Sequence, residues 1–202
     1  MSELFSIQLQ NRQQQGGDGV WLDLPTTTEQ VQVALRQIGI SSDNPQGLFI
    51  SGYFAEEEKR FAISYNMVLA SNVDELNFLA SRLETLSTGE RAELNAALQA
   101  PQSELFSIGR ITDFPENVDY YVHLPDVHGP AQLGDYYLNR SGMVNMPEEW
   151  KGGIDTAQFG RYVAQQEQGA FTQYGYLVKS GDEWQKVHEG QPVPEEYRVL
   201  SF

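Results

Sequence analysis

The fold depends most on residues 72–86, which read NVDELNFLASRLETL. Asn72 has the side chain of a helix N-cap, and apolar residues follow it at steps of three and four, the spacing of one helix face. These apolar positions are Val73, Leu76, Leu79, Leu83 and Leu86. The stretch therefore predicts a capped amphipathic helix that buries one face against the rest of the protein.

A second helix is expected directly after the first. Ser87 and Glu90 have the spacing of a capping box, and Pro101 can end the helix that they open. Its inward positions would be Leu94, Ala97 and Leu98. The uncharged stretch 62–72 is interpreted as buried or connecting chain. We therefore predict a short helical middle domain over residues 63–101.

A small sheet is expected before these helices. Alternating or apolar runs bounded by turn residues predict strands at residues 4–9, 20–24 and 47–54. Between the last two strands, Thr26 and Glu29 have capping-box spacing for a helix that Gly39 can end. Residues 1–62 are therefore predicted to form a small antiparallel sheet with one helix.

The chain is of mixed type from residue 102 onward. Strands are predicted at residues 118–124, 171–178 and 197–202, and helices at residues 130–140 and 155–167. In the second helix Asp155 would be the N-cap, with Phe159, Tyr162 and Val163 buried. The predicted fold class is therefore α+β, with three small domains. The third domain covers residues 102–202, with an extension from about residue 180.

Acidic residues dominate the charge of the chain. Its 202 residues contain 28 Asp and Glu against 13 Lys and Arg, which gives a formal charge of −15. Residues 1–50, 51–100, 101–150 and 151–202 carry −3, −4, −6 and −2. The carboxylates are therefore expected on folded elements rather than in a terminal tail. Such a surface repels phosphates, which argues against nucleic acid or an anionic membrane as partner.

Other classes are excluded by what the sequence lacks. It has no Cys, which excludes disulfide scaffolds, thiolate metal sites and thiol catalysis, and which fits a reducing compartment. It has no apolar run of about 18 residues, and its first residues do not form a secretory signal. We therefore expect a cytoplasmic protein.

Few residues point to chemistry. His123, Asp126 and His128 could supply metal ligands, but no fourth ligand is apparent and a solvated loop is expected there. The run at 56–60, EEEKR, is interpreted as solvated surface. Phosphate-binding glycine loops, nucleophile elbows and zinc-protease motifs do not occur. We expect no cofactor, no metal and no catalysis, an enzyme using His123 and Asp126 being one alternative. The three tryptophans are expected in the core: Trp21, Trp150 and Trp184.

An ordered set of segments between residues 4 and 178 carries a family resemblance. After an N-terminal strand these segments are 19–25 (GVWLDLP), 48–53 (LFISGY), 72–77 (NVDELN), 87–100, 135–137 (DYY), 141–142 (SG), 147–148 (PE), 154–155 (ID) and 159–161 (FGR). In this order they resemble the ArdA family of antirestriction proteins. Ser51-Gly52 departs from the His-Asp that the family usually carries there, and residues 180–202 have no counterpart.

The resemblance implies both architecture and function. Its members are elongated, with three small domains in a row and a dimer formed through the C-terminal domain. They are not enzymes. They mimic the charge and shape of duplex DNA and occupy the DNA groove of type I restriction–modification enzymes. The implied partner is therefore the methyltransferase core of such an enzyme, and a homodimer is expected.

Sixteen acidic residues are predicted to face that partner. They are expected to be exposed on the first two domains and at the start of the third, and to act together: Asp18, Asp23, Glu29, Glu56, Glu57, Asp74, Glu75, Glu84, Glu90, Glu93, Asp113, Glu116, Asp119, Asp135, Glu148 and Glu149. The alternative is a mobile-element accessory protein that keeps the fold but binds another protein through a conventional interface.

Overall fold

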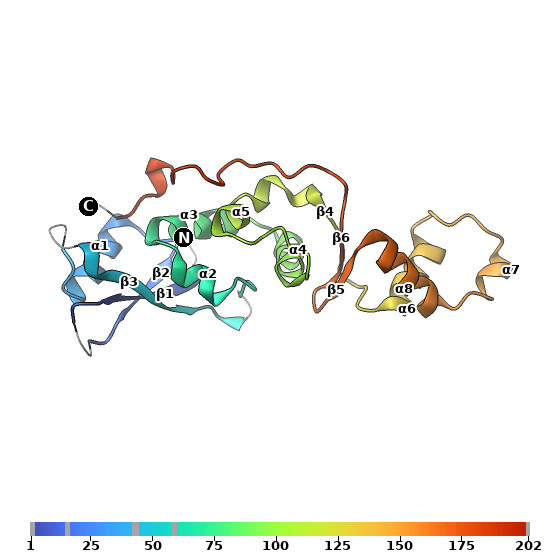
Figure 1. Cartoon of the computed structure of the whole chain (residues 1–202), viewed down its shortest axis with the longest axis horizontal. Helices are drawn as coiled ribbons and strands as arrows, with labels where there is room; N and C mark the ends of the chain where they lie inside the picture. The colour runs from blue at the N-terminus through green and yellow to red at the C-terminus, as the bar shows by residue number, and fades with distance from the viewer. Residues whose placement is uncertain (1–2, 15–16, 42–44, 58–59, 201–202) are drawn as a thin grey trace. The chain divides into compact units, whose positions relative to one another are not determined.

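The computed structural model describes residues 3–14, 17–41, 45–57 and 60–200, which group into two compact units (Figure 1). Unit 1 comprises Met1–Ser87, Leu105–Glu116 and Gln185–Phe202. Unit 2 comprises Thr88–Glu104 and Asn117–Trp184. Each unit contains helices and a three-stranded antiparallel sheet, which confirms a mixed α+β fold. The division into three domains is not confirmed.

Unit 1 is built on the sheet that the sequence predicts. Its strands are β1 (Phe5–Asn11), β2 (Val20–Leu24) and β3 (Leu48–Phe54), in the order β2-β1-β3. Phe5 pairs with Leu24 and Ile7 with Leu22, so apolar side chains share one face of the sheet. The register between β1 and β3 shifts between Gln8 and Leu9. This bulge changes the twist without changing which face is buried.

The first helix begins one residue later than predicted. It is α1 (Thr28–Gln37), and the capping box is formed by Thr27 and Gln30, so the predicted box of Thr26 with Glu29 is wrong. Thr26 is buried, and its N–H donates to the side chain of Asn77 at 2.7 Å instead. Residues 26–28 are all threonine, and each could cap a helix. The contact between Thr26 and Asn77 leaves Thr27 as the cap. Gly39 has φ +68 and follows the helix as predicted.

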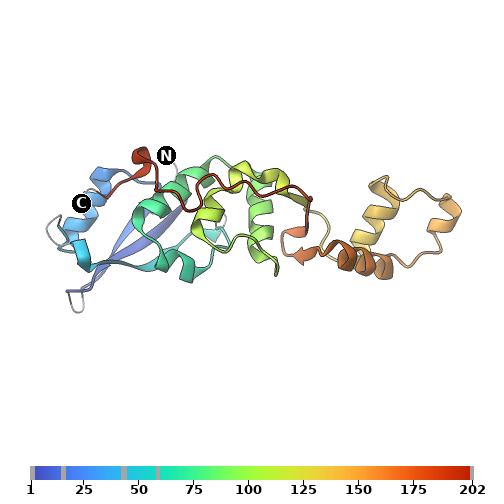
Figure 2. The ribbon, with the colours of Figure 1, turned by 45° about the horizontal axis from the view of Figure 1, so that its top comes forward.

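The predicted amphipathic helix is α3 (Val73–Glu84), with Asn72 as its N-cap in a capping box with Glu75. Leu76, Leu79 and Leu83 are fully buried, as the periodicity predicts. A short helix α2 (Tyr65–Ala70) lies within the uncharged stretch, and α5 (Ile108–Thr112) packs on α3. Figure 2 shows these helices beside the sheet of unit 1. The unit also contains the 3-10 turns η1 (Pro45–Gly47) and η3 (Phe114–Glu116).

Unit 2 contains the second sheet, with strand order β4-β6-β5. Its strands are β4 (Tyr121–Leu124), β5 (Ala170–Thr172) and β6 (Gly175–Lys179), and α4 (Thr88–Gln99) packs on β4 and β6. The predicted single strand 171–178 is wrong, because the chain turns at Gly175 with φ +113 and folds back as a hairpin. The predicted strand 118–124 is shorter, since its start is a 3-10 turn, η4 (Val118–Tyr120).

Two helices of unit 2 pack through glycine. They are α6 (Pro130–Asp135), continued by a π-helical turn η5 (Tyr136–Arg140), and α8 (Thr156–Glu167), with α7 (Glu148–Lys151) between them in sequence. A Cβ on Gly160 would overlap the carbonyl oxygen of Pro130. Asp155 caps α8 as predicted, but the expectation of a buried Tyr162 is wrong, since it is 60% exposed. It lies two residues beyond Gly160, on the opposite side of the helix.

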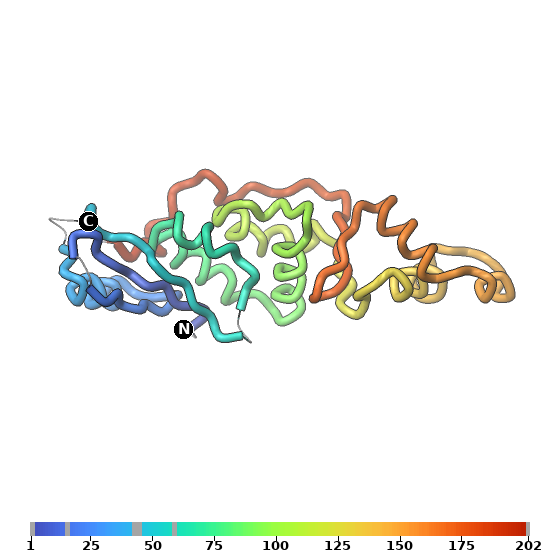
Figure 3. Tube along the Cα trace, turned by 60° about the horizontal axis from the view of Figure 1, so that its bottom comes forward, coloured from blue at the N-terminus to red at the C-terminus, as the bar shows by residue number. Residues whose placement is uncertain are grey.

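The C-terminal residues do not form the predicted strand. The only regular element among residues 185–200 is a 3-10 turn, η6 (Glu195–Tyr197), and the predicted strand's last two residues lie outside the described chain. Figure 3 shows this segment running beside the helices of unit 1. We refer to residues 185–200 as the C-terminal strap.

Candidate acidic interaction surface

Half of the sixteen predicted acids are exposed, and both units carry some of them. Those of unit 1 are Asp18, Asp23, Glu29, Glu56 and Glu57, and those of unit 2 are Asp119, Glu148 and Glu149. Hydrogen bonds from its own backbone N–H and from the Thr27 side chain lower the pKa of Glu29. This carboxylate is therefore ionised well below neutral pH.

Seven predicted acids are half-buried, and several of these have partners within the chain. They are Asp74, Glu75, Glu84, Glu90, Glu93, Glu116 and Asp135. Glu116 forms an ion pair with Arg82, and Asp135 lies 3.3 Å from Arg140. Asp74 accepts hydrogen bonds from the backbone N–H groups of residues 199 and 200, at 2.7 and 2.9 Å. These internal partners reduce the charge that such groups can offer to another molecule.

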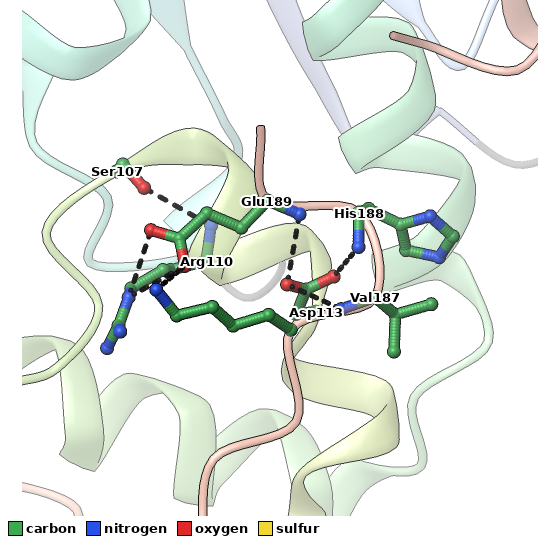
Figure 4. A network of polar contacts seen from close by, with 7 residues as sticks. Ser107, Arg110, Asp113, Val187, His188 and Glu189 are labelled. Atoms are coloured by element: carbon green, nitrogen blue, oxygen red, sulfur yellow. Dashed lines mark hydrogen bonds and ion pairs between the residues drawn. The ribbon is translucent and has the colours of Figure 1, made fainter. Parts of the chain in front are cut away.

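Asp113 is fully buried, so the expectation that it is exposed is wrong. Its carboxylate accepts three backbone N–H bonds from the C-terminal strap, from Val187 at 3.3 Å, His188 at 2.6 Å and Glu189 at 3.2 Å (Figure 4). Backbone N–H groups that converge on a carboxylate stabilise its charge without a cation. Asp113 therefore fixes the strap and is not part of a partner-facing surface.

Further contacts hold the strap along unit 1. The guanidinium of Arg110 lies 3.1 Å from the carboxylate of Glu189 (Figure 4). The Asn77 side chain donates to the carbonyl oxygen of Tyr197 at 3.0 Å, and the ring of Phe78 packs against that tyrosine at a tilt of 39°, with centroids 4.6 Å apart. The strap also lines an open cavity of about 630 Å³ with α2, α3 and α5. It is thus an integral part of the unit.

Among the residues that the structure describes, seven exposed acids were not in the predicted set of sixteen. They are Glu3, Asp126, Asp155, Asp182, Glu183, Glu195 and Glu196. Most lie in loops or turns, where polar side chains are exposed by default. Their acidic side chains are the sequence signal that could have indicated them.

The pKa of Glu93 is raised to about 8, first by burial and then by the carboxylates of Glu90 and Asp119. Its Oε1 atom has no hydrogen-bond partner among the described residues. Glu93 is therefore largely protonated at neutral pH and adds little to the negative surface. It is the predicted acid whose contribution the structure reduces most after Asp113.

The raised pKa makes stability depend on pH. The folded chain holds the Glu93 proton more tightly than the unfolded chain, whose pKa is near 4.5, so stability falls as pH rises from about 4.5 to about 8. We expect Glu93→Gln to lose less stability between pH 5 and pH 9, by a few degrees of Tm. Thermal unfolding at both pH values measures this. Glu149→Gln, at an exposed site, is the control, and equal pH dependence of Glu93→Gln and wild type would contradict the account.

Two of the three residues considered as metal ligands, His123 and His128, make other contacts. The ring Nε2 of His123 lies 2.7 Å from the carbonyl oxygen of Tyr174, and the backbone N–H of His128 donates to the side chain of Gln132. In the parts of the chain that the structure describes, no three His, Asp or Glu side chains are placed to hold a metal ion. The alternative of an enzyme using His123 with Asp126 gains no support from this geometry.

Two of the three tryptophans are not core residues. Trp21 is 49% exposed and Trp150 is 68% exposed, so the expectation that they are buried is wrong. Trp184 is half-buried, with its ring 5.1 Å from that of Tyr120. Exposed tryptophans are a common feature of binding surfaces, because a large apolar ring gains much from contact.

The geometry thus defines an acidic α+β protein with exposed carboxylates on both of its units. The model of the antirestriction protein (ArdA) family matches residues 16–178, about four fifths of the sequence, and the chain belongs to this family. No curated protein matches the chain significantly. The strap lies beyond the matched residues.

Membership confirms the resemblance seen in the sequence and implies an antirestriction function. The family is one of inhibitors, which points to restriction enzymes as partners. Within the described ranges, no helix is both long enough and apolar enough to cross a membrane.

Proposed function

We propose that the protein inhibits type I restriction–modification enzymes by placing carboxylates where these enzymes bind the phosphates of duplex DNA. The observation that carries the proposal is the set of exposed acids inside the family-matched residues of both units. Five of them lie in unit 1, namely Asp18, Asp23, Glu29, Glu56 and Glu57. A sixth exposed acid of this unit, Glu3, precedes the matched residues. The contact needs no cofactor and no catalytic step.

The physical basis is the charge density of DNA. A duplex carries about one negative charge per 1.7 Å, and proteins that bind it present Lys and Arg to those phosphates. A folded chain with spaced carboxylates can meet the same cations. A dimer would carry −30, twice the −15 of one chain, which equals about 15 base pairs at two phosphates each. The proposed mimic is therefore of a short duplex.

We also propose that the active species is a homodimer formed through unit 2. Met143 is 76% exposed and Trp150 is 68% exposed, and both lie in the segment between η5 and α8. Exposed apolar side chains that lie close together mark contact surfaces more often than single ones do. Their exposure supports self-association at this segment.

The salt dependence of binding tests the proposal. Binding to a purified type I methyltransferase core should weaken steeply with salt, by on the order of 10³-fold or more between 50 and 200 mM if six or more charges are paired. Isothermal titration calorimetry or fluorescence anisotropy at four salt concentrations measures the slope of log affinity against log salt concentration. A shallow slope would contradict mimicry. It would favour the alternative, a mobile-element accessory protein that binds through a conventional interface.

A further inference from the structure

The outward face of the unit 1 sheet carries an exposed aromatic pair. Trp21 on β2 is 49% exposed and Phe54 on β3 is 56% exposed, and their ring centroids lie 6.5 Å apart in an edge-to-face arrangement. β1 separates the two strands, so the pair spans the sheet. The helices α1 and α3 pack against β2, where Leu22 and Leu24 are buried and the alternate residues, Trp21 among them, face outward.

A glycine gives Trp21 the room to lie across the sheet. Gln8 of β1 stands opposite Trp21 on one side and opposite Gly52 of β3 on the other. A Cβ on Gly52 would lie 3.0 Å from the Cη2 atom of the indole and 3.0 Å from the Cβ of Gln8. The indole therefore extends over β1 as far as Gly52, and its exposed part forms a platform on this face.

Two carboxylates adjoin this platform. The hydroxyl of Ser6 lies 2.8 Å from Oδ1 of Asp23 and 3.4 Å from Oε1 of Glu3. Ser6 itself stands opposite Asp23 on one side and Phe54 on the other. One hydroxyl has one proton and cannot donate to both carboxylates at once. The negative charges thus lie next to the aromatic pair, and they leave acceptor oxygens for a further donor.

A guanidinium already lies over an aromatic ring of the same face. Gln10 follows Gln8 by two residues on β1 and stands opposite Phe49 of β3, so Phe49 shares the outward face. The guanidinium carbon of Arg12 lies 5.2 Å from the centroid of the Phe49 ring, a cation–π distance. The outward face of the sheet therefore already holds one contact between a guanidinium and an aromatic ring.

We propose that Trp21, Phe54, Asp23 and Glu3 form a docking site for an arginine side chain of the basic DNA-binding surface of the partner enzyme. The proposal rests on the proposed function and deepens it. The guanidinium stacks on the indole of Trp21, and its N–H groups donate to the carboxylates of Asp23 and Glu3. Arginine suits the site better than lysine, because its planar group stacks and donates in a fork at the same time.

Stacking and charge pairing differ in their response to salt, and this difference tests the site. Trp21→Ala should weaken binding to the methyltransferase core on the order of tenfold at every salt concentration, with the salt slope unchanged. Trp21→Phe should lose less, because it keeps a ring. Asp23→Asn should instead lower the slope. Val33→Ala, which changes an equally exposed apolar side chain on α1, is the matched control and should bind as wild type.

A spectroscopic signal keeps the test independent of affinity. In a Trp150→Phe/Trp184→Phe background, Trp21 is the remaining indole, and its emission should change when the methyltransferase core binds. Wild-type affinity of Trp21→Ala, with a steep salt slope retained, would overturn the docking site and leave the proposed function standing. Failure of the wild-type protein to bind the core would overturn both.

Discussion

Asp113→Ala is expected to lower the free energy of unfolding of unit 1 by about 3–5 kcal/mol. The substitution removes a fully buried carboxylate that accepts three backbone N–H bonds, and these donors would be left without an acceptor. Urea denaturation followed by circular dichroism measures the loss. Asp113→Asn keeps one acceptor oxygen and should lose less.

The matched control for this prediction is Asp18→Ala. Asp18 is an exposed acid of the same unit, so its removal should change stability by less than about 0.5 kcal/mol. Removal of residues 185–202 should lower stability at least as much as Asp113→Ala, because it deletes all strap contacts together. A strap that only rests on the surface would give unchanged unfolding in both variants, and that result would refute the structural role of Asp113.

Amide replacement of six exposed acids together is expected to abolish inhibition of the restriction enzyme. The set is Glu3, Asp18, Asp23, Glu29, Glu56 and Glu57. Each exposed pair contributes about 0.3–1 kcal/mol, so one replacement should change affinity less than about fivefold, whereas six should lower it by roughly 20-fold or more. Inhibition of DNA cleavage by a type I enzyme, measured with all single variants and the sixfold variant, gives the comparison.

A fourfold variant outside the family-matched residues controls for the loss of charge itself. It replaces the exposed acids Asp182, Glu183, Glu195 and Glu196 by their amides and should retain inhibition. The sixfold variant should also unfold at the wild-type temperature to within a few degrees. If one amide replacement alone removed inhibition, a specific contact would be responsible and the distributed surface would be wrong.

Local signals explain which elements the sequence could predict. α3 was predictable because its cap at Asn72 and its apolar stripe both lie within fifteen residues. The start of α1 was not predictable, because the threonine that caps it depends on a contact with Asn77, about fifty residues away. The hairpin of β5 and β6 resembles one strand in sequence because only Gln173 and Tyr174 separate the paired residues Thr172 and Gly175.

The candidate surface was predictable in its composition but not in its details. Asp113 occurs in a stretch of sequence that resembles an ordinary polar segment, and only the distant strap shows that it is buried. Trp21 alternates with Leu22 and Leu24 in a short strand, so its outward direction could have been read from the pattern. The general preference of tryptophan for the core favours the opposite, buried position.

Competition with duplex DNA tests the central claim most directly. A fluorescently labelled duplex carrying the recognition sequence is bound to a purified type I methyltransferase core, and the protein is added at increasing concentration. The account predicts full displacement of the duplex, with a midpoint that rises steeply as salt is increased. Formation of a complex in which the protein and the duplex are bound to the core together would contradict it.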